Sequence, residues 1–237
     1  MCSNYLHINY GIIDAEVNDM RENMKYDTNI YQLRESVLKR MIQIIQQQRY
    51  VQDNSIVFYG DSIIEYYDVE HVFKDLGPVY NCGIGGITSD MLLHFVDEGV
   101  IKYHPAKVFI LVGTNDLGNT MMASPRDIAL NVKEMVEIIH YNLPECQIHL
   151  LSPIPCIENL HGYQSMHQGL RSHDTLEMIM QEYQRMIPYD YVHFMDIYHS
   201  LFENGQLKED VFIDGLHIND EGYQIITQII QDTLKGE

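Results

Sequence analysis

The chain has 237 residues, of which 46% are hydrophobic, and this is enough apolar material for the core of one α/β domain. Lys and Arg number 15 against 34 Asp and Glu, which gives a formal net charge of −19 at pH 7. A field of that sign repels nucleic acids and anionic membranes, so we expect neither as a partner. It favours a neutral or cationic small molecule as the substrate.

The amino-terminal residues 1–7 contain neither the basic region nor the apolar region of a secretory signal. No apolar run approaches the length of a membrane span, and we therefore expect a cytoplasmic protein. The four cysteines lack the pair spacing of a metal site, and the twelve histidines show no His-x-x-x-His pattern. The sequence predicts reduced thiols, no bound metal and no cofactor.

Residues 1–27 show no clean hydrophobic period, and we interpret residues 1–50 as an amino-terminal extension that contains one amphipathic helix over 29–50. Apolar residues recur in this helix at spacings of three and four, as on one helical face. These residues are Ile30, Leu33, Val37, Leu38, Met41, Ile44 and Ile45. Asn29 and Gln32 fit a capping box at the helix start. We expect the helix to pack on a sheet or on a second copy of the chain, which would form a homodimer.

Five short apolar runs alternate with helical patterns through residues 51–237, and each run is predicted to be a β-strand. The strands are expected over 56–59, 78–81, 107–112, 147–151 and 191–195. Helices are expected after Ser62, after a cap at Thr88 or Ser89, from Pro125 after a cap at Ser124, over 172–187, and over 219–234 after a cap at Asn219. The polar stretch 157–170 is predicted to be a surface loop. This alternation is typical of a three-layer α/β/α fold with a doubly wound five-stranded parallel sheet.

The strand over 56–59 ends at Gly60-Asp61-Ser62 and leads directly into a helical pattern. A serine at such a turn holds its hydroxyl at the carboxyl edge of the sheet. Its own N–H stands at a helix start, where it suits a developing negative charge. Ser62 is therefore a candidate nucleophile, and Asp61 is interpreted as the residue that shapes the turn. Taken alone, the same residues also fit an ordinary helix cap.

In an open parallel sheet the carboxyl ends of the strands share one edge, where ligands bind. Asp214 and His217 stand three residues apart before the last helix, so the carboxylate can orient one ring nitrogen while the other accepts a proton from Ser62. The Ser62 N–H, the Gly86 N–H and the Asn115 side-chain amide are candidate donors to an oxyanion. Each of these turns taken singly also fits a purely structural role.

Four ordered blocks of the sequence resemble the GDSL or SGNH hydrolases. They are Gly60-Asp61-Ser62-Ile63, with Ile where Leu is usual, Asn81-x-Gly83-x-x-Gly86-x-Thr88, Gly113-Thr114-Asn115-Asp116 and Asp214-Gly215-Leu216-His217. The match covers roughly residues 55–235 and is most similar to the subgroup with platelet-activating-factor acetylhydrolase subunits and lysophospholipase-like or acetyl esterases. The resemblance implies a flavodoxin-like hydrolase domain over 51–237 and metal-free hydrolysis of short acyl esters.

The sequence therefore predicts a serine esterase for short-chain esters, above all acetyl esters, of a small molecule, carbohydrate or lysolipid. Its catalytic residues would be Ser62, Asp214 and His217, with an oxyanion hole formed by Ser62, Gly86 and Asn115. A thioesterase or transacylase with the same triad is one alternative. A non-catalytic binding protein on the same fold is the other.

Overall fold

The computed structural model describes residues 34–118, 122–162 and 169–236. Residues 35–237 form one compact unit, so the predicted boundary between residues 50 and 51 falls inside it. The predicted extension over 1–27 and the predicted helix start with its capping box at Asn29 lie outside the described residues.

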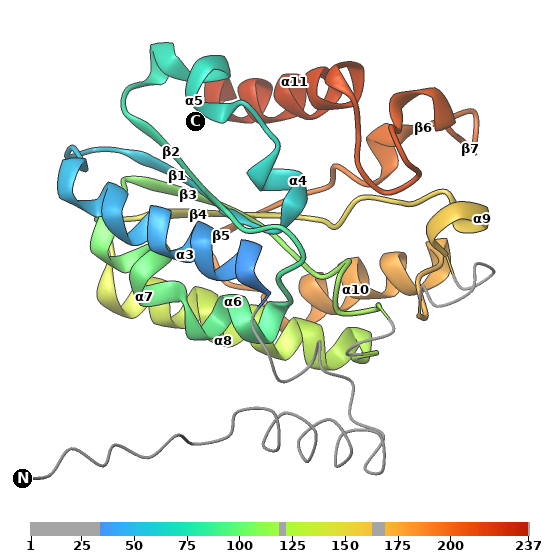
Figure 1. The fold of residues 1–237 in the computed structure, drawn as a ribbon, viewed down its shortest axis with the longest axis horizontal. Coiled ribbons are helices and arrows are strands. Elements are labelled where there is room, and N and C mark those ends of the chain that lie inside the picture. The colour runs from blue at the N-terminus through green and yellow to red at the C-terminus, as the bar shows by residue number, and fades with distance from the viewer. Residues whose placement is uncertain (1–33, 119–121, 163–168, 237) are drawn as a thin grey trace, which may run out of the picture. The chain divides into compact units, whose positions relative to one another are not determined.

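Five parallel strands form the central sheet in the order β2-β1-β3-β4-β5 (Figure 1). Their bounds are β1 (Ile56–Gly60), β2 (Val79–Gly83), β3 (Lys107–Leu111), β4 (Gln147–Leu151) and β5 (Val192–Met195). β2 lies on one side of β1 in the sheet, and β3, the next strand along the chain, lies on the other side of β1. In such a sheet the crevice for ligands opens at the carboxyl ends of the two strands where the order reverses, here β1 and β3. The structure confirms the predicted doubly wound α/β fold.

Helices cover both faces of the sheet (Figure 1). One face carries α3 (Glu35–Gln47), α6 (Ser89–His94), α7 (Val96–Gly99), α8 (Pro125–Asn142) and α10 (His173–Met186). The other face carries α4 (Ser62–Glu65), α5 (Val69–Val72) and α11 (Asp220–Gly236). The smaller elements are α9 (Glu158–His161), the hairpin of β6 (Phe202–Glu203) and β7 (Gln206–Leu207), and 3-10 turns over Gln48–Tyr50, Lys74–Leu76, Ile101–Tyr103, His199–Leu201 and Glu209–Val211.

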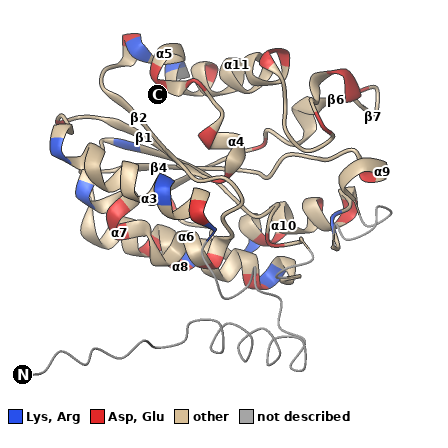
Figure 2. Cartoon of the chain, viewed as in Figure 1, with Lys and Arg blue, Asp and Glu red and all other residues tan. Residues whose placement is uncertain are grey.

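Acidic residues are spread over helices on both faces of the sheet and over the loops between them (Figure 2). The charge imbalance of the sequence is therefore a property of the surface in general. It acts as a diffuse negative field around the domain.

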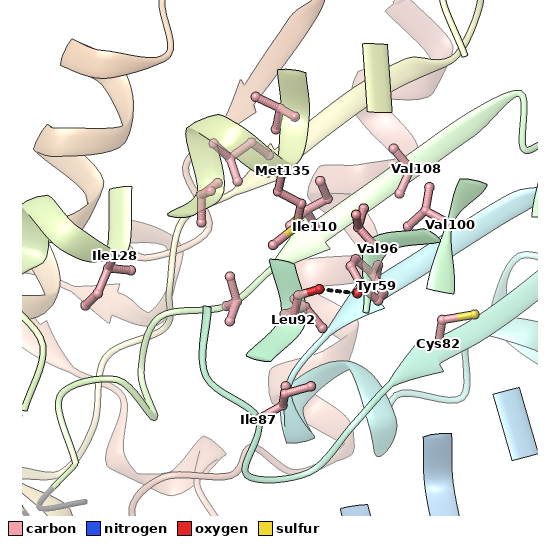
Figure 3. Close-up of a cluster of buried hydrophobic side chains, with 14 of the residues drawn as sticks. Tyr59, Cys82, Ile87, Leu92, Val96, Val100, Val108, Ile110, Ile128 and Met135 are labelled. Atoms are coloured by element: carbon pink, nitrogen blue, oxygen red, sulfur yellow. Dashed lines mark hydrogen bonds between the residues drawn. The ribbon is translucent and has the colours of Figure 1, made fainter. Parts of the chain in front are cut away.

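Alternate residues of each strand face opposite helical layers, which gives the domain two apolar cores. On the side of α6 and α8, Tyr59 is fully buried and its hydroxyl donates a hydrogen bond of 2.6 Å to the Leu92 carbonyl (Figure 3). On the side of α4 and α11, the Phe58 ring stacks on Phe73 and Phe109 with centroid distances of 5.1 and 4.7 Å. Both faces of β1 are thus tightly packed, and β1 provides a rigid base for the turn that follows it.

Three of the longer helices, α8, α10 and α11, begin after a residue whose side chain caps them, and the caps at Ser124 and Asn219 were predicted. The side chains of Ser124, Ser172 and Asn219 each accept the backbone N–H of the residue three positions later, at 3.1 Å. These bonds satisfy donors that the first turn of a helix leaves without a partner. The helix expected after Ser62 is present as the single turn α4.

The rest of the domain buries only part of the predicted apolar face of α3. Val37 and Ile44 are buried in the core beside α7. Leu38 and Ile45 from the same predicted face are exposed, by 46% and 41%. The prediction of a helix over these residues is confirmed, and α3 packs on the domain through Val37 and Ile44. The alternative contact, with a second copy of the chain, stays a prediction.

Candidate active site

Ser62 stands at the point where β1 gives way to α4. A Cβ atom on Gly60 would lie 2.1 Å from the Leu111 carbonyl oxygen of β3, so only glycine allows this close approach. The Asp61 side chain accepts the Ile63 N–H at 2.9 Å and caps α4, which confirms that Asp61 shapes the turn. The Ser62 N–H has no acceptor among the described residues, as expected for the first turn of a helix.

Ser62, His217 and Asp214 form one chain of hydrogen bonds. Ser62 Oγ lies 2.9 Å from His217 Nε2, and His217 Nδ1 lies 2.7 Å from Asp214 Oδ2. The other Asp214 oxygen accepts the backbone N–H groups of Leu216 and His217 at 2.9 and 2.8 Å. With Nδ1 donating to the carboxylate, Nε2 is the nitrogen that can accept the serine proton.

The Asp214 carboxylate is held in its charged form. Burial alone would raise its pKa, but hydrogen bonds from the backbone and ring of His217 and from the Leu216 N–H outweigh burial and lower the pKa to about 2. Asp214 is therefore ionised at neutral pH. A fixed negative charge 2.7 Å from Nδ1 stabilises the imidazolium that forms when Nε2 takes a proton.

The glycine loop after β2, residues 83–86, lies against Ser62. A Cβ atom on Gly85 would lie 3.8 Å from Ser62 Cβ. Gly86 has a φ of +75°, and its N–H has no acceptor in the described part of the chain. Asn115 belongs to the turn after β3, and its amide Nδ2 donates to the Ile87 carbonyl at 3.1 Å. The three candidate oxyanion donors therefore come together at one edge of the sheet.

Comparison with known proteins matches residues 58–225 to the GDSL-like lipase/acylhydrolase family. This range covers more than half of the chain and includes every residue of the site described above. The chain belongs to the GDSL-like lipase/acylhydrolase family. It is therefore a hydrolase that acts on ester bonds.

Two solved structures are similar to this acylhydrolase over most of its length. One is a Streptococcus pneumonia protein provisionally described as a platelet activating factor, with 28% identity and a TM-score of 0.75 over 93% of this chain and 99% of that chain. The other, from Bacteroides fragilis NCTC 9343, is provisionally described as an acylhydrolase. It has 23% identity and a TM-score of 0.71 over 86% of this chain and 99% of that chain.

A curated relative is the N-acylneuraminate cytidylyltransferase of Escherichia coli O18:K1:H7 (strain RS218 / NMEC), which is 26% identical over 184 residues. The match covers 77% of this acylhydrolase and 41% of the E. coli protein. The chain thus spans less than half the length of this relative.

The residue after Asn115 in the acylhydrolase has a role that the sequence did not reveal. Both oxygens of the buried Asp116 accept the Ser89 backbone N–H, at 2.9 and 3.0 Å, and Ser89 Oγ donates to one of them at 2.5 Å. Ser89 was one of two predicted caps of α6, but Thr88 occupies the cap position and its side chain makes no cap bond. Asp116 thus ties the Asn115 turn to the helix that follows the glycine loop.

Arg171 also supports the turn that contains Asn115. Its Nε donates to the Thr114 carbonyl at 2.9 Å, and the residue is only 6% exposed. Burial lowers the pKa of the Arg171 guanidinium. In the sequence, Asp116 appeared only as the last residue of the third block and Arg171 appeared in no motif. Their supporting role was not predicted, because nothing in the local pattern distinguishes a buried charged residue from an exposed one.

The stretch 157–170 is not a simple surface loop. It contains α9, while residues 163–168 lie outside the described residues. The Ile157 N–H donates to the Gly215 carbonyl at 2.8 Å, and a Cβ atom on Gly215 would lie 2.8 Å from Leu160 Cβ. This segment therefore packs on the turn that carries Asp214 and His217. Its residues 158–161 form a helical turn where a loop was predicted, but none of them is buried, so the predicted surface location holds for this part.

An exposed aromatic ring completes the surroundings of His217. Tyr66, at the end of α4, is 60% exposed, and its ring centroid lies 5.3 Å from that of His217.

Within the described ranges, no group of three or more metal-ligating side chains is placed to hold an ion. The same ranges contain no helix long and apolar enough to cross a bilayer. Cys82, Cys146 and Cys156 are free thiols buried in the core.

Proposed function

We propose that this acylhydrolase is a serine esterase that cleaves short-chain esters, above all acetyl esters, with Ser62 as nucleophile. The observation that carries the proposal is the unbroken chain of hydrogen bonds from Asp214 through His217 to Ser62. Nucleophile, general base and orienting acid are the three roles that acyl transfer to a serine requires.

In the proposed reaction, Ser62 Oγ attacks the ester carbonyl carbon while His217 Nε2 takes the hydroxyl proton. The carbonyl oxygen becomes an oxyanion, which accepts hydrogen bonds from the Ser62 N–H, the Gly86 N–H and the Asn115 amide. One such donor typically stabilises the transition state by about 3 kcal/mol. The protonated His217 then donates to the leaving alkoxide, and the alcohol departs from an acyl-enzyme.

The second half of the reaction uses the same residues in reverse order. His217 takes a proton from water, and the resulting hydroxide attacks the acyl carbon of the acyl-enzyme. The tetrahedral intermediate collapses, His217 returns the proton to Ser62 Oγ, and the carboxylic acid leaves. Asp214 remains ionised throughout and stabilises the imidazolium in both halves.

The proposed substrates are small esters of a neutral alcohol, carbohydrate or lysolipid. A negative field around the protein favours neutral or cationic esters over anionic ones. The exposed Tyr66 ring beside His217 offers an apolar surface to the alcohol part of the ester. The curated relative is named for an N-acylneuraminate, which is a sugar acid and therefore anionic. An O-acetylated N-acylneuraminate belongs among the compounds to test, as the anionic counterpart of an O-acetylated neutral sugar.

The experiment measures hydrolysis of p-nitrophenyl acetate by wild type, Ser62→Ala and His217→Ala. We expect both variants to lose roughly 10⁴-fold or more in kcat. His199→Ala is a matched control, because His199 forms the same local pair with Asp196, at 2.7 Å, without a serine at its Nε2. Equal rates for wild type and Ser62→Ala would refute the proposal.

A substrate series then separates the esterase from its alternatives. p-Nitrophenyl esters of increasing acyl length, an O-acetylated neutral sugar and an O-acetylated N-acylneuraminate define the ester class. Preference for acetyl-CoA would indicate a thioesterase, and transfer to an added alcohol in place of water would indicate a transacylase. Failure of a fluorophosphonate probe to label Ser62 in folded protein would favour a non-catalytic binding protein.

A further inference from the structure

Three polar side chains connect the glycine loop to α4, the helix that begins with Ser62. They come from three elements: Arg40 from α3, Glu65 from α4 and Asn81 from β2. Arg40 lies outside residues 58–225, which carry the family match. The helix that contains Arg40 is therefore not part of what the family comparison describes.

Glu65 holds the loop directly beside the proposed oxyanion donor. Its Oε2 accepts the Gly85 N–H at 2.5 Å, and Gly85 is the residue before Gly86. Glu65 stands one helical turn after Ser62, so the same short helix supplies the nucleophile and orients the loop. A Cβ atom on Gly85 would lie 2.7 Å from Glu65 Oε2, so a side chain at this position would displace the carboxylate from the Gly85 N–H.

Asn81 joins the end of β2 to the end of α4. Its Nδ2 donates to the carbonyls of Ile64 at 2.7 Å and Tyr67 at 2.9 Å, and its Oδ1 accepts the Gly83 N–H at 2.9 Å. A Cβ atom on Gly83 would lie 2.2 Å from the Glu65 nitrogen, so the two backbones run in direct contact. The loop and α4 therefore form one rigid unit.

Arg40 completes this unit from outside. Its Nε donates to the Gly83 carbonyl at 2.8 Å, and Nη2 donates to the Asn81 carbonyl at 2.7 Å. The same Nε lies 3.8 Å from Glu65 Oε1, and the two side chains are only 22% and 28% exposed. At this low exposure water screens the pair weakly, so the guanidinium offsets much of the Glu65 charge.

We propose that Arg40 and Glu65 are positioning residues for the ester hydrolysis described above. They hold the Gly86 N–H and the Ser62 N–H in one geometry, so that both donors face the developing oxyanion. Arg40 also compensates the Glu65 carboxylate, whose uncompensated charge would repel that oxyanion. The inference rests on the proposed function, since it concerns the same site.

The test compares kcat and KM for p-nitrophenyl acetate in the full chain and in variants at both positions. Arg40→Ala and Glu65→Ala should each lower kcat by about 10- to 100-fold with KM nearly unchanged, because a displaced donor weakens binding of the transition state alone. Glu65→Gln should recover most of kcat, because the amide oxygen still accepts the Gly85 N–H. Arg40→Lys should remain slow, because an ammonium group does not span both carbonyls as the guanidinium fork does.

A matched control removes another anchor of the amino-terminal segment. Gln48 Nε2 donates to the Glu98 carbonyl at 2.7 Å and to the Glu98 carboxylate at 2.8 Å, and among the described residues its side-chain hydrogen bonds reach only Glu98. Gln48→Ala should lower the thermal midpoint without changing kcat. The double variant Arg40→Ala with Glu65→Ala should lose less than the product of the two single losses, since both residues act on one loop.

Wild-type kcat in folded Arg40→Ala and Glu65→Ala would overturn the inference while leaving the esterase intact, provided that Ser62→Ala is inactive. If the alanine variants do not fold, the kcat of Arg40→Lys tests the positioning role instead. An unchanged kcat in that variant overturns the inference. Wild-type protein that neither hydrolyses the ester nor reacts with a fluorophosphonate would instead refute the proposed function, and the positioning role with it.

Discussion

Asp116→Asn tests how the site tolerates a buried charge. The Asp116 carboxylate is buried beside Ser89, and burial raises its pKa from an ordinary 3.8 to about 7, with a smaller contribution in the same direction from Asp61. Hydrogen bonds from Ser89 oppose this rise without cancelling it. We predict that replacing the acid by its amide flattens the pH dependence of stability.

A carboxyl group whose pKa is higher in the folded state binds more protons in the folded than in the unfolded chain between the two pKa values. The free energy of unfolding therefore falls as the pH rises through that interval, from about 4 to about 7 for Asp116. Between pH 5 and about pH 7, the free energy of unfolding of the wild type should fall by up to about 3 kcal/mol more than that of the variant. Burial also raises the pKa of Asp61, to about 6, and this contribution to the pH dependence is present in wild type and variant alike.

The assay is urea unfolding followed by circular dichroism at pH 5 and pH 8. Wild type and Asp116→Asn are compared with Asp190→Asn, in which an exposed carboxylate is replaced. The asparagine oxygen at 116 can still accept the Ser89 N–H, so the variant should fold. If wild type and Asp116→Asn lose the same stability between the two pH values, the buried carboxylate does not titrate as described.

Asp214→Asn should lower kcat for p-nitrophenyl acetate by roughly 10³- to 10⁴-fold, because His217 loses the charge that stabilises its protonated form. A loss of less than tenfold would contradict the role of Asp214. Asn115→Ala should lower kcat by about 10²-fold at nearly constant KM, because its amide is proposed to act on the oxyanion. A higher KM at constant kcat would mean that Asn115 binds the substrate instead. The homodimer stays a prediction: light scattering should give twice the chain mass of 27.7 kDa, and Ile42→Glu on the exposed face of α3 should halve it. A monomer mass for wild type would contradict it.

The apolar runs of the sequence predicted all five strands of the central sheet. The run predicted over 78–81 became Val79–Gly83, and that over 107–112 became Lys107–Leu111. Such runs are informative because a strand covered on both faces must be apolar at nearly every position. For α3, the hydrophobic period predicted the helix correctly but did not show which of its apolar residues the domain covers, and part of its apolar face is exposed. The period of a helix shows which side chains share one face, but it does not show how much of that face the neighbouring elements bury.

The sequence by itself determined which chemical groups the site contains, through turns that follow apolar strands. It did not determine which groups meet. The pattern Asp-x-x-His also occurs at Asp68–His71, Asp190–His193 and Asp196–His199, and the last of these repeats the ring-to-carboxylate bond at 2.7 Å. Within the described part of the chain, only His217 has a serine hydroxyl at Nε2, supplied by Ser62 from 155 positions away.

The sequence encodes the Asp214–His217 pair but not its approach to Ser62, because the two interactions join residues at very different separations along the chain. A carboxylate and an imidazole three residues apart meet through the geometry of one turn, which the local sequence encodes. The approach of Ser62 to His217 depends on where β1 lies in the sheet and on how α11 and the turn before it pack over β1. That arrangement is set by the strand order and by the apolar cores on both faces of the sheet, and only the tertiary structure decides it.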